Sequence, residues 1–210
     1  MARMEDILEV YQRPYDPRFP VVCFDERPYQ LLQGLARELP MEPGRVAKQD
    51  YQYERRGTCC VLAAVEPRRG RRQVEVQRHR GKRDYTRFME RLSAAYPQAE
   101  RIILIQDNLN THGPGSFYEF LPAVEARALS QRFELHYTPK KASWLNMVEI
   151  ELSALSKQCL GRRIVSMSEL RDQLSACVRR RNKERVRINW RFTTERAREK
   201  LQRHYKAVLN

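Results

Sequence analysis

The chain has 210 residues, of which 41% are hydrophobic, so it is long enough for one domain with a real core and a modest extension. Its net charge of +14 favours a polyanionic partner, because Lys and Arg that neutralise phosphates release the counterions condensed on nucleic acid. The longest apolar runs, residues 61–65 and 102–105, are far too short to cross a bilayer, which excludes a membrane protein.

The N-terminal residues indicate a cytoplasmic protein. Residues 1–20 contain acidic side chains and three prolines, and they lack the apolar stretch that forms the middle of a signal peptide. The five cysteines are an odd number and form no CxxC pair, so neither a disulfide framework nor a zinc ribbon is predicted. We expect them to be reduced and mostly buried.

The first half of the chain predicts a linker followed by strands. Residues 1–20 are interpreted as an interdomain linker, since a short helical pattern there (Met4, Ile7, Leu8, Tyr11) is followed by three prolines. Residues 21–24 predict a buried strand that ends in Asp25, and a polar loop with the breakers Gly34, Pro40, Pro43 and Gly44 follows. Residues 51–65 and 73–77 predict two or three further strands, joined by a turn at 67–72.

The second half predicts alternating helices and strands and then helices alone. The expected helices are residues 84–96, 117–129, 145–160, 168–180 and 194–205, and the expected strands are 102–105, which delivers Asp107, and 133–137. This order is typical of an α/β fold with a mixed sheet flanked by helices. The core is placed at residues 21–165, with basic helices at 166–210 packed on it.

Basic side chains concentrate in two regions. Residues 157–210 hold 16 Lys or Arg against 5 Asp or Glu, a net +11 of the total +14. A second cluster of seven arginines and one lysine, between residues 68 and 83, brackets the predicted turn between strands. One such run is often only a solvated surface, but two on a chain this basic favour contact with phosphates.

Asp25 and Asp107 each end a short apolar run, which places two carboxylates at equivalent ends of two core strands. If those strands are neighbours, they lie about 4.8 Å apart, and carboxylates that close repel each other unless they share a divalent cation. A pair of Mg²⁺ ions can activate a nucleophile and stabilise the leaving oxygen of a phosphoryl displacement. Taken singly, each Asp is more typical of a turn residue or a helix N-cap than of a metal ligand.

Such a site needs a third carboxylate, and residues 145–160 offer two. Glu149 and Glu151 lie at opposite edges of the apolar stripe of this predicted helix, so its periodicity does not choose between them. Glu149 taken alone is typical of a surface carboxylate.

Four segments in a fixed order then resemble a known family. They are residues 21–26 (VVCFDE), 106–112 (QDNLNTH), 138–149 (TPKKASWLNMVE) and 188–193 (INWRFT). Together they are similar to the catalytic domain of mariner-like DDE transposases of bacterial insertion sequences, the insertion sequence 630 family. The resemblance runs from about residue 4 to Tyr205.

The resemblance implies an RNase H-like (retroviral integrase-like) fold with a basic helical C-terminal extension. It implies a catalytic, metal-binding triad of Asp25, Asp107 and Glu149, with the spacing Asn146-x-x-Glu149 selecting Glu149 over Glu151. The implied cofactor is Mg²⁺, with Mn²⁺ as a substitute. Family members cut DNA at the terminal inverted repeats of the element and join the 3′ ends to target DNA, typically at TA. The implied assembly is a homodimer in the transposition complex. The implied location is the bacterial cytoplasm, in association with the nucleoid.

Seven further residues are candidates for hydrogen bonding to the metal ligands or for contacting DNA: Glu26, Asn108, His112, Lys140, Lys141, Trp144 and Asn146. The alternative for Asn108 is that it and Asn110 cap a helix that begins near Ser116. The alternative for Trp144 and Asn146 is that they fix the start of the following helix against the core. A further, less favoured role for Trp144 is stacking on an unpaired base.

The sequence departs from the family pattern in three ways. Relatives usually carry about a hundred residues of helix-turn-helix before this domain, whereas here the chain is expected to start inside the linker. Lys141 stands where many relatives have His, and Arg27 follows the first Asp-Glu, where its charge is expected to lower metal occupancy.

Three functions therefore stay in competition. The first is an active metal-dependent DNA endonuclease and strand-transferase. The second is a catalytically silent DNA-binding remnant of a truncated transposase. The third, from fold analogy alone, is a nuclease that cuts RNA–DNA hybrids.

Overall fold

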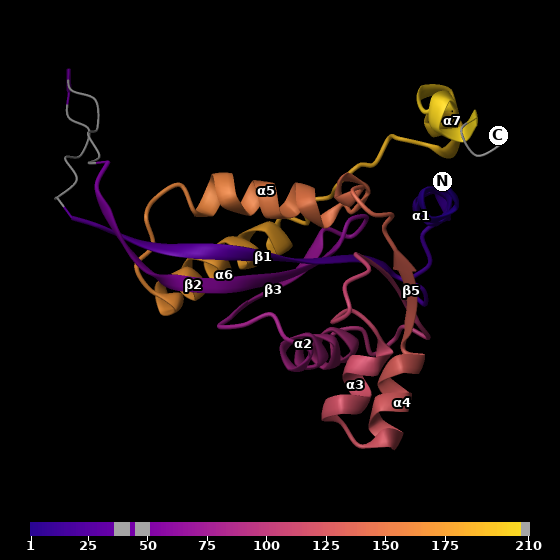
Figure 1. Ribbon diagram of the computed structural model, residues 1–210, viewed down its shortest axis with the longest axis horizontal. Coiled ribbons are helices and arrows are strands. Elements are labelled where there is room, and N and C mark those ends of the chain that lie inside the picture. The colour runs from indigo at the N-terminus through magenta and orange to yellow at the C-terminus, as the bar shows by residue number, and fades with distance from the viewer. Residues whose placement is uncertain (36–42, 45–50, 207–210) are drawn as a thin grey trace.

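The computed structural model describes residues 1–35, 43–44 and 51–206. A five-stranded sheet with the order β3-β2-β1-β4-β5 forms its centre (Figure 1). The strands are β1 (Val21–Gly34), β2 (Tyr53–Glu66), β3 (Arg71–Gln77), β4 (Ile102–Gln106) and β5 (Phe133–Tyr137). The pairs β1–β2 and β2–β3 are antiparallel, whereas β4 is parallel to both β1 and β5. The predicted mixed sheet is confirmed.

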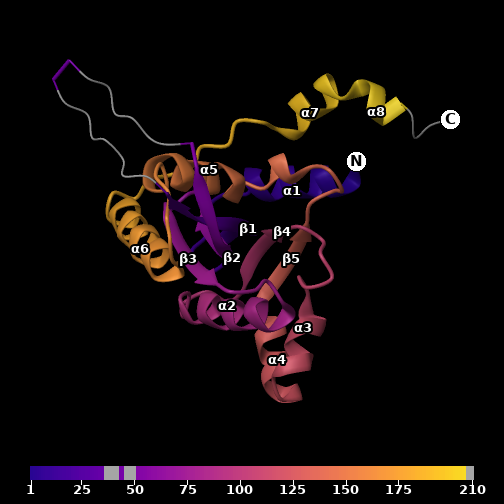
Figure 2. The same ribbon diagram turned by 60° about the vertical axis from the view of Figure 1, so that its left-hand side comes forward.

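Helices cover both faces of this sheet. They are α1 (Ala2–Gln12), α2 (Lys82–Ala94), α3 (Pro114–Phe120), α4 (Ala123–Gln131), α5 (Val148–Cys159), α6 (Met167–Lys183), α7 (Thr194–Lys200) and α8 (Gln202–Lys206), with a 3-10 turn, η1, at Ser143–Leu145. Figures 1 and 2 show α1 and α5 on one side of the sheet and α2, α3 and α4 on the other. The three-layer arrangement follows from the order of elements.

Alternation along β1 divides the core in two. Val22 and Phe24 pack among α2, α3 and α4, whereas Cys23 packs among α1, α5 and α6. Successive side chains of a strand point to opposite faces, so a continuous apolar run feeds both layers. The carboxylate that follows this run, Asp25, is thereby carried by a strand that is buried on both faces.

β1 is longer than predicted. The expected strand stopped at Phe24, but pairing with β2 continues as far as Gly34↔Tyr53, so the first part of the predicted loop is strand. Residues 36–42 and 45–50 of that loop lie outside the described residues. β4 pairs with β1 only as far as Cys23, so the rest of β1 is an edge strand, where polar residues and Pro28 are tolerated.

Three predicted helices are divided, interrupted or begin later than expected. The helix expected at 117–129 is divided into α3 and α4, because Leu121 is extended and Pro122 begins a new helix. A residue before proline is driven out of the helical region, which explains the break. The helix expected from residue 145 begins at Val148, after η1, and the last predicted helix is interrupted at Leu201.

The cysteine prediction was partly wrong. Cys23, Cys59 and Cys60 are free and buried, as expected. Cys159 and Cys177 instead form a disulfide that joins α5 to α6. Their Cα atoms lie 6.3 Å apart because the two helices pack on the same face of the sheet, a proximity that spacing in the sequence does not reveal.

Both ends of the described chain pack on the core. The helical pattern predicted near the N-terminus is confirmed as α1, whose residues Met4, Ile7, Leu8, Val10 and Tyr11 are buried. The Tyr11 hydroxyl donates a hydrogen bond to the Leu145 carbonyl at 2.7 Å. Arg198 of α7 reaches back to Glu5 of α1 at 2.7 Å, so these two helices are in contact.

Within residues 1–35, 43–44 and 51–206, no helix combines enough length with enough apolar character to cross a membrane.

Candidate active site

Two strands bring Asp25 and Asp107 to the same edge of the sheet. β1 and β4 are parallel neighbours with Cys23 opposite Ile105, so Asp25 and Asp107, each two residues further on, lie at the same level. Adjacent strands are about 4.8 Å apart. The predicted juxtaposition of these two strands is confirmed.

Glu149 reaches this edge from the first turn of α5. Asn146, which is 1% exposed, fixes the start of the helix: its side-chain amide donates a hydrogen bond to the Phe24 carbonyl at 2.8 Å. Phe24 directly precedes Asp25, so Asn146 ties the segment that carries Glu149 to the strand that carries Asp25. This contact gives a physical reason for the spacing Asn146-x-x-Glu149.

Glu149 and Glu151, which periodicity left undecided, occupy different environments. Glu151 is 1% exposed and forms ion pairs with Arg72 at 2.9 Å and Arg181 at 2.8 Å. Glu149 is partly exposed and accepts a hydrogen bond from Arg27 at 2.8 Å. Glu151 is therefore a buried structural anchor, and Glu149 is the carboxylate left at the sheet edge.

Asp25 lies in the field of the other two acids. Burial raises the pKa of Asp25 to about 6; the Glu26 N–H, which donates to Asp25 at 2.7 Å, opposes the shift, and the charges of Asp107 and Glu149 add to it. Because both carboxylates act on Asp25, the three acidic groups form one electrostatic cluster.

His112 joins Asp107 to Glu26. Its ring is 2% exposed; Nδ1 contacts the Asp107 carboxylate and Nε2 contacts the Glu26 carboxylate at 3.1 Å. Burial lowers the pKa of His112, but hydrogen bonds with Asp107 and Glu26 outweigh it and raise the pKa to about 9. A protonated His112 thus bonds to both carboxylates and orients Asp107.

The cluster has the ligand chemistry that a divalent metal requires, although two of its carboxylates are already paired with basic side chains. Carboxylate oxygens are the ligands that Mg²⁺ and Mn²⁺ favour, and repulsion among three of them at Asp25 is what such an ion relieves. Among the described residues, no three His, Cys, Asp or Glu side chains are grouped closely enough to form a metal cage. Glu149 is held by Arg27, and Asp107 by His112.

Three of the remaining predicted residues are polar side chains at the surface. Asn108, Lys140 and Lys141 are exposed, as is Asn110. The capping alternative for Asn108 and Asn110 was wrong, because α3 begins at Pro114 with Gly113 as its N-cap and has no side-chain cap.

Trp144 was expected to pack against the core at the start of the following helix, but it does not. Its side chain is 47% exposed and lies near two aromatic residues of the C-terminal segment, Trp190 at 6.4 Å and Phe192 at 5.5 Å between ring centroids. Trp144 therefore holds residues 188–193 against the loop before α5. Two of the four sequence segments that carried the resemblance are thus in contact.

Two features of the site were missed from the sequence. Arg27 was expected to act on the metal by charge alone, whereas it pairs directly with Glu149. Arg80 lies 4.0 Å from Glu26 and was noticed only as part of a basic run. Neither partner is signalled by spacing, because each contact joins different elements.

Several solved structures with a similar fold are complexes of Mos1. The chain matches the Mos1 mariner paired-end complex with Mn at a TM-score of 0.58 and 16% identity, with 88% of this chain and 57% of that chain covered. A pre-cleavage Mos1 transpososome and the Mos1 strand transfer complex match at TM-scores of 0.56 and 0.55, each at 15% identity. The matches cover 89% and 88% of this chain, and 61% and 59% of those chains. A search of curated protein sequences finds no match.

These matches confirm the predicted RNase H-like fold, and the chain spans about three-fifths of the length of the Mos1 chains. The family model described as DDE superfamily endonuclease matches residues 20–171, which is more than half of the sequence. The chain belongs to the DDE superfamily endonucleases.

Proposed function

We propose that this chain is the catalytic domain of a mariner-like transposase of the insertion sequence 630 family, and that it nicks DNA and joins the freed 3′ ends to a target. The single observation that carries the proposal is the strand register that puts Asp25 and Asp107 at one edge of the sheet, where burial and the charges of Asp107 and Glu149 raise the pKa of Asp25. Repulsion among these carboxylates favours a shared cation, and the family is one of endonucleases.

Asp25, Asp107 and Glu149 would hold Mg²⁺, with Mn²⁺ as a substitute. When bound, a pair of such ions activates a water or 3′-hydroxyl and stabilises the leaving oxygen at phosphorus. In this chain, Asn146 positions the helix that carries Glu149, and His112 orients the Asp107 carboxylate. The same groups serve hydrolysis and strand joining, because only the nucleophile differs.

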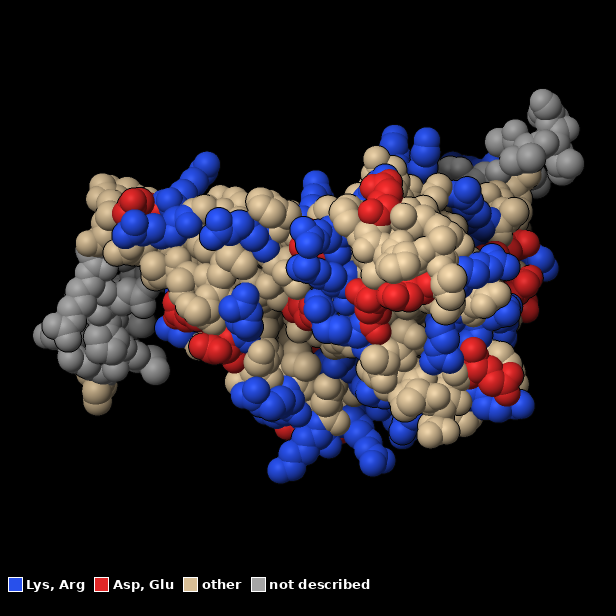
Figure 3. All heavy atoms as spheres, turned by 90° about the horizontal axis from the view of Figure 1, so that it is seen from below, with Lys and Arg blue, Asp and Glu red and all other residues tan. Residues whose placement is uncertain are grey.

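DNA is the proposed substrate, in the form of the terminal inverted repeats of an element and a target with the sequence TA, handled by a homodimer. The net charge of +14 supports a polyanionic partner. Lys and Arg outnumber acidic side chains over the face that is seen from below in Figure 1 (Figure 3). The similar Mos1 structures, a paired-end complex and a strand transfer complex, support this substrate class.

Nicking of supercoiled plasmid DNA tests the proposal. We expect relaxed circles to accumulate with Mg²⁺ or Mn²⁺, and chelation by EDTA to stop the reaction. A plasmid that is bound but stays supercoiled with either ion would contradict nuclease activity. An excess of RNA–DNA hybrid that is itself cut and suppresses plasmid nicking would assign the site to hybrids instead.

A second candidate function is the catalytically silent DNA-binding remnant, and the ion pair between Arg27 and Glu149 favours it. At 2.8 Å, the guanidinium occupies a carboxylate oxygen that a metal would need. A remnant of this kind binds DNA with strong salt dependence and does not cut it.

Arg27→Gln distinguishes the two candidates. Because Gln removes the competing charge, we expect the variant to reach half-maximal nicking at a Mg²⁺ concentration about threefold or more below that of the wild type. Arg56→Gln, which removes an arginine paired with Glu54 on the surface, is the control and leaves this concentration unchanged. An unchanged Mg²⁺ requirement in Arg27→Gln would mean that Arg27 does not compete with the metal.

A further inference from the structure

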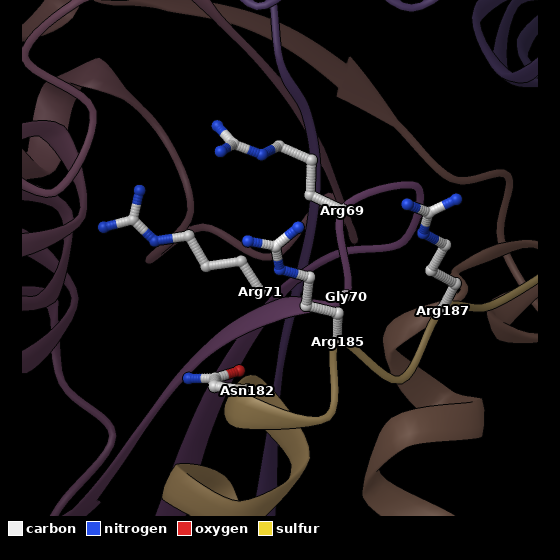
Figure 4. Close-up of a pocket in the computed structure, with 6 residues that line it drawn as sticks. All are labelled: Arg69, Gly70, Arg71, Asn182, Arg185 and Arg187. Atoms are coloured by element: carbon white, nitrogen blue, oxygen red, sulfur yellow. The ribbon is translucent and has the colours of Figure 1, made fainter.

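A pair of adjoining cavities at the turn between β2 and β3 is lined mainly by arginines. The first, of about 290 Å³, is lined by Arg69, Gly70, Arg71, Asn182, Arg185 and Arg187. The second, of about 640 Å³, is lined by Tyr15, Arg68, Arg69, Arg187, Ile188 and Asn189. Arg69 and Arg187 line both, so the cavities adjoin, and we call them together the arginine groove. Figure 4 shows the side chains of Arg69, Arg71, Arg185 and Arg187 extending in the same general direction.

The backbone beneath the groove is closely packed. Gly70 has a φ of +64°, and a Cβ there would lie 2.5 Å from the Arg185 carbonyl carbon, so the turn fits directly against the segment after α6. Asn182 accepts from the Arg72 N–H and donates to the Arg72 carbonyl, both at 2.9 Å. The turn and the end of α6 therefore present their arginines from one rigid support.

A buried arginine reinforces this support. Arg72 is 4% exposed and donates hydrogen bonds to the carbonyls of Gly70 at 2.9 Å and Val186 at 2.6 Å. Its charge is balanced by Glu151 at 2.9 Å. Arg72 thus serves the fold, and the arginines of the groove are left with their charged groups at the surface.

The exposed arginines are not neutralised by the protein. In the described part of the chain, Arg69, Arg71, Arg185 and Arg187 have no carboxylate within 4.0 Å of the guanidinium, and Arg71 lies over the Tyr96 ring at 4.5 Å. Glu66 lies near Arg69 and Arg71, but it is 1% exposed and therefore sits below the groove. Like charges in a concave surface raise the local concentration of anions.

The arginine groove lies away from the acidic cluster. Ala63 on β2 is level with Asp25, and β2 continues for three more residues, to Glu66, before the turn that carries Arg68 and Arg69. At about 3.3 Å per residue of strand, this separates the turn from the level of Asp25 by roughly 10 Å. Asp107 follows the C-terminal end of β4, whereas the groove lies beyond the N-terminal ends of β1 and β4. The groove is therefore not part of the site that holds the carboxylates.

We propose that the arginine groove binds the phosphate backbone of DNA, as a second contact separate from the acidic cluster. This inference rests on the proposed function for its substrate class. Two adjoining cavities that share two arginines suit the consecutive phosphates of a polymer better than one small anion. Arginine is well suited to the task, because its planar guanidinium donates two parallel hydrogen bonds to a phosphate.

The test is binding of a fluorescently labelled DNA duplex by the full chain in EDTA, measured by anisotropy across a series of salt concentrations. The variant is Arg185→Gln with Arg187→Gln, and the control is Arg101→Gln with Arg127→Gln, which removes the same charge from exposed arginines elsewhere. A plot of log affinity against log salt has a negative slope, and we expect the magnitude of this slope to decrease by about 2 in the variant. We also expect the affinity of the variant at low salt to be lower by about tenfold or more. Equal loss in variant and control would overturn the proposal.

Two further measurements separate possible failures. Thermal unfolding of both double variants is expected to match the wild type, because all four arginines are exposed; Arg69→Gln with Arg187→Gln provides a second variant if the first does not fold. Plasmid nicking by the wild type reports on the acidic cluster independently. A chain that nicks DNA but binds it equally well in variant and control contradicts only the groove. A chain that loses binding in the variant but never nicks contradicts only the nuclease.

Discussion

Replacement of Glu151 by alanine is expected to lower the free energy of unfolding by about 3–5 kcal/mol, the usual cost of removing one partner from a buried ion pair. Glu151 receives two hydrogen bonds from Arg181, at 2.8 and 3.0 Å, and pairs with Arg72 at 2.9 Å. Without the carboxylate, two guanidinium groups stay buried without their counter-charge. Urea unfolding followed by circular dichroism measures the change.

Glu149→Ala is the matched control for this substitution. It removes a carboxylate from the same helix, but one that is partly exposed, and such pairs contribute about 0–1 kcal/mol. Equal destabilisation by the two substitutions would mean that the network around Glu151 does not stabilise the fold as its burial implies.

Asp107→Asn is expected to reduce metal-dependent nicking by about 1,000-fold or more, because a neutral amide lacks the charge that a divalent ion requires. The change is nearly isosteric, and the amide retains the ability to bond His112, so the fold is expected to persist. The rate of conversion of supercoiled to relaxed plasmid measures the effect, and circular dichroism checks the fold. Nicking at the wild-type rate would remove Asp107 from the reaction.

The sequence predicted the elements that are buried. The apolar run at residues 102–105 became β4, which is buried along its whole length, because a strand covered on both faces needs nearly continuous apolar residues. The positions of Asp25 and Asp107 followed from the ends of such runs. By contrast, β1 beyond Phe24 was missed because an edge strand tolerates polar residues and proline.

The contacts around the candidate site were less predictable. The Arg27–Glu149 pair joins residues 122 apart in the sequence, and His112 reaches Glu26 across 86 residues. Periodicity reports which face of one element is apolar, and it carries no information about such partners. For the same reason it left Glu149 and Glu151 undecided, until burial of Glu151 between Arg72 and Arg181 separated them.

Joint binding of a divalent ion by Asp25, Asp107 and Glu149 is tested most directly by Mn²⁺ uptake, followed as the loss of the free-ion signal in electron paramagnetic resonance. We predict that the wild-type chain takes up Mn²⁺. Asp25→Asn, Asp107→Asn and Glu149→Gln are each expected to weaken uptake about tenfold or more. Glu119→Gln, at a surface pair with Lys82, serves as the control and leaves uptake unchanged. Mn²⁺ affinity that is the same in the wild type and all three variants of the triad would contradict the assignment.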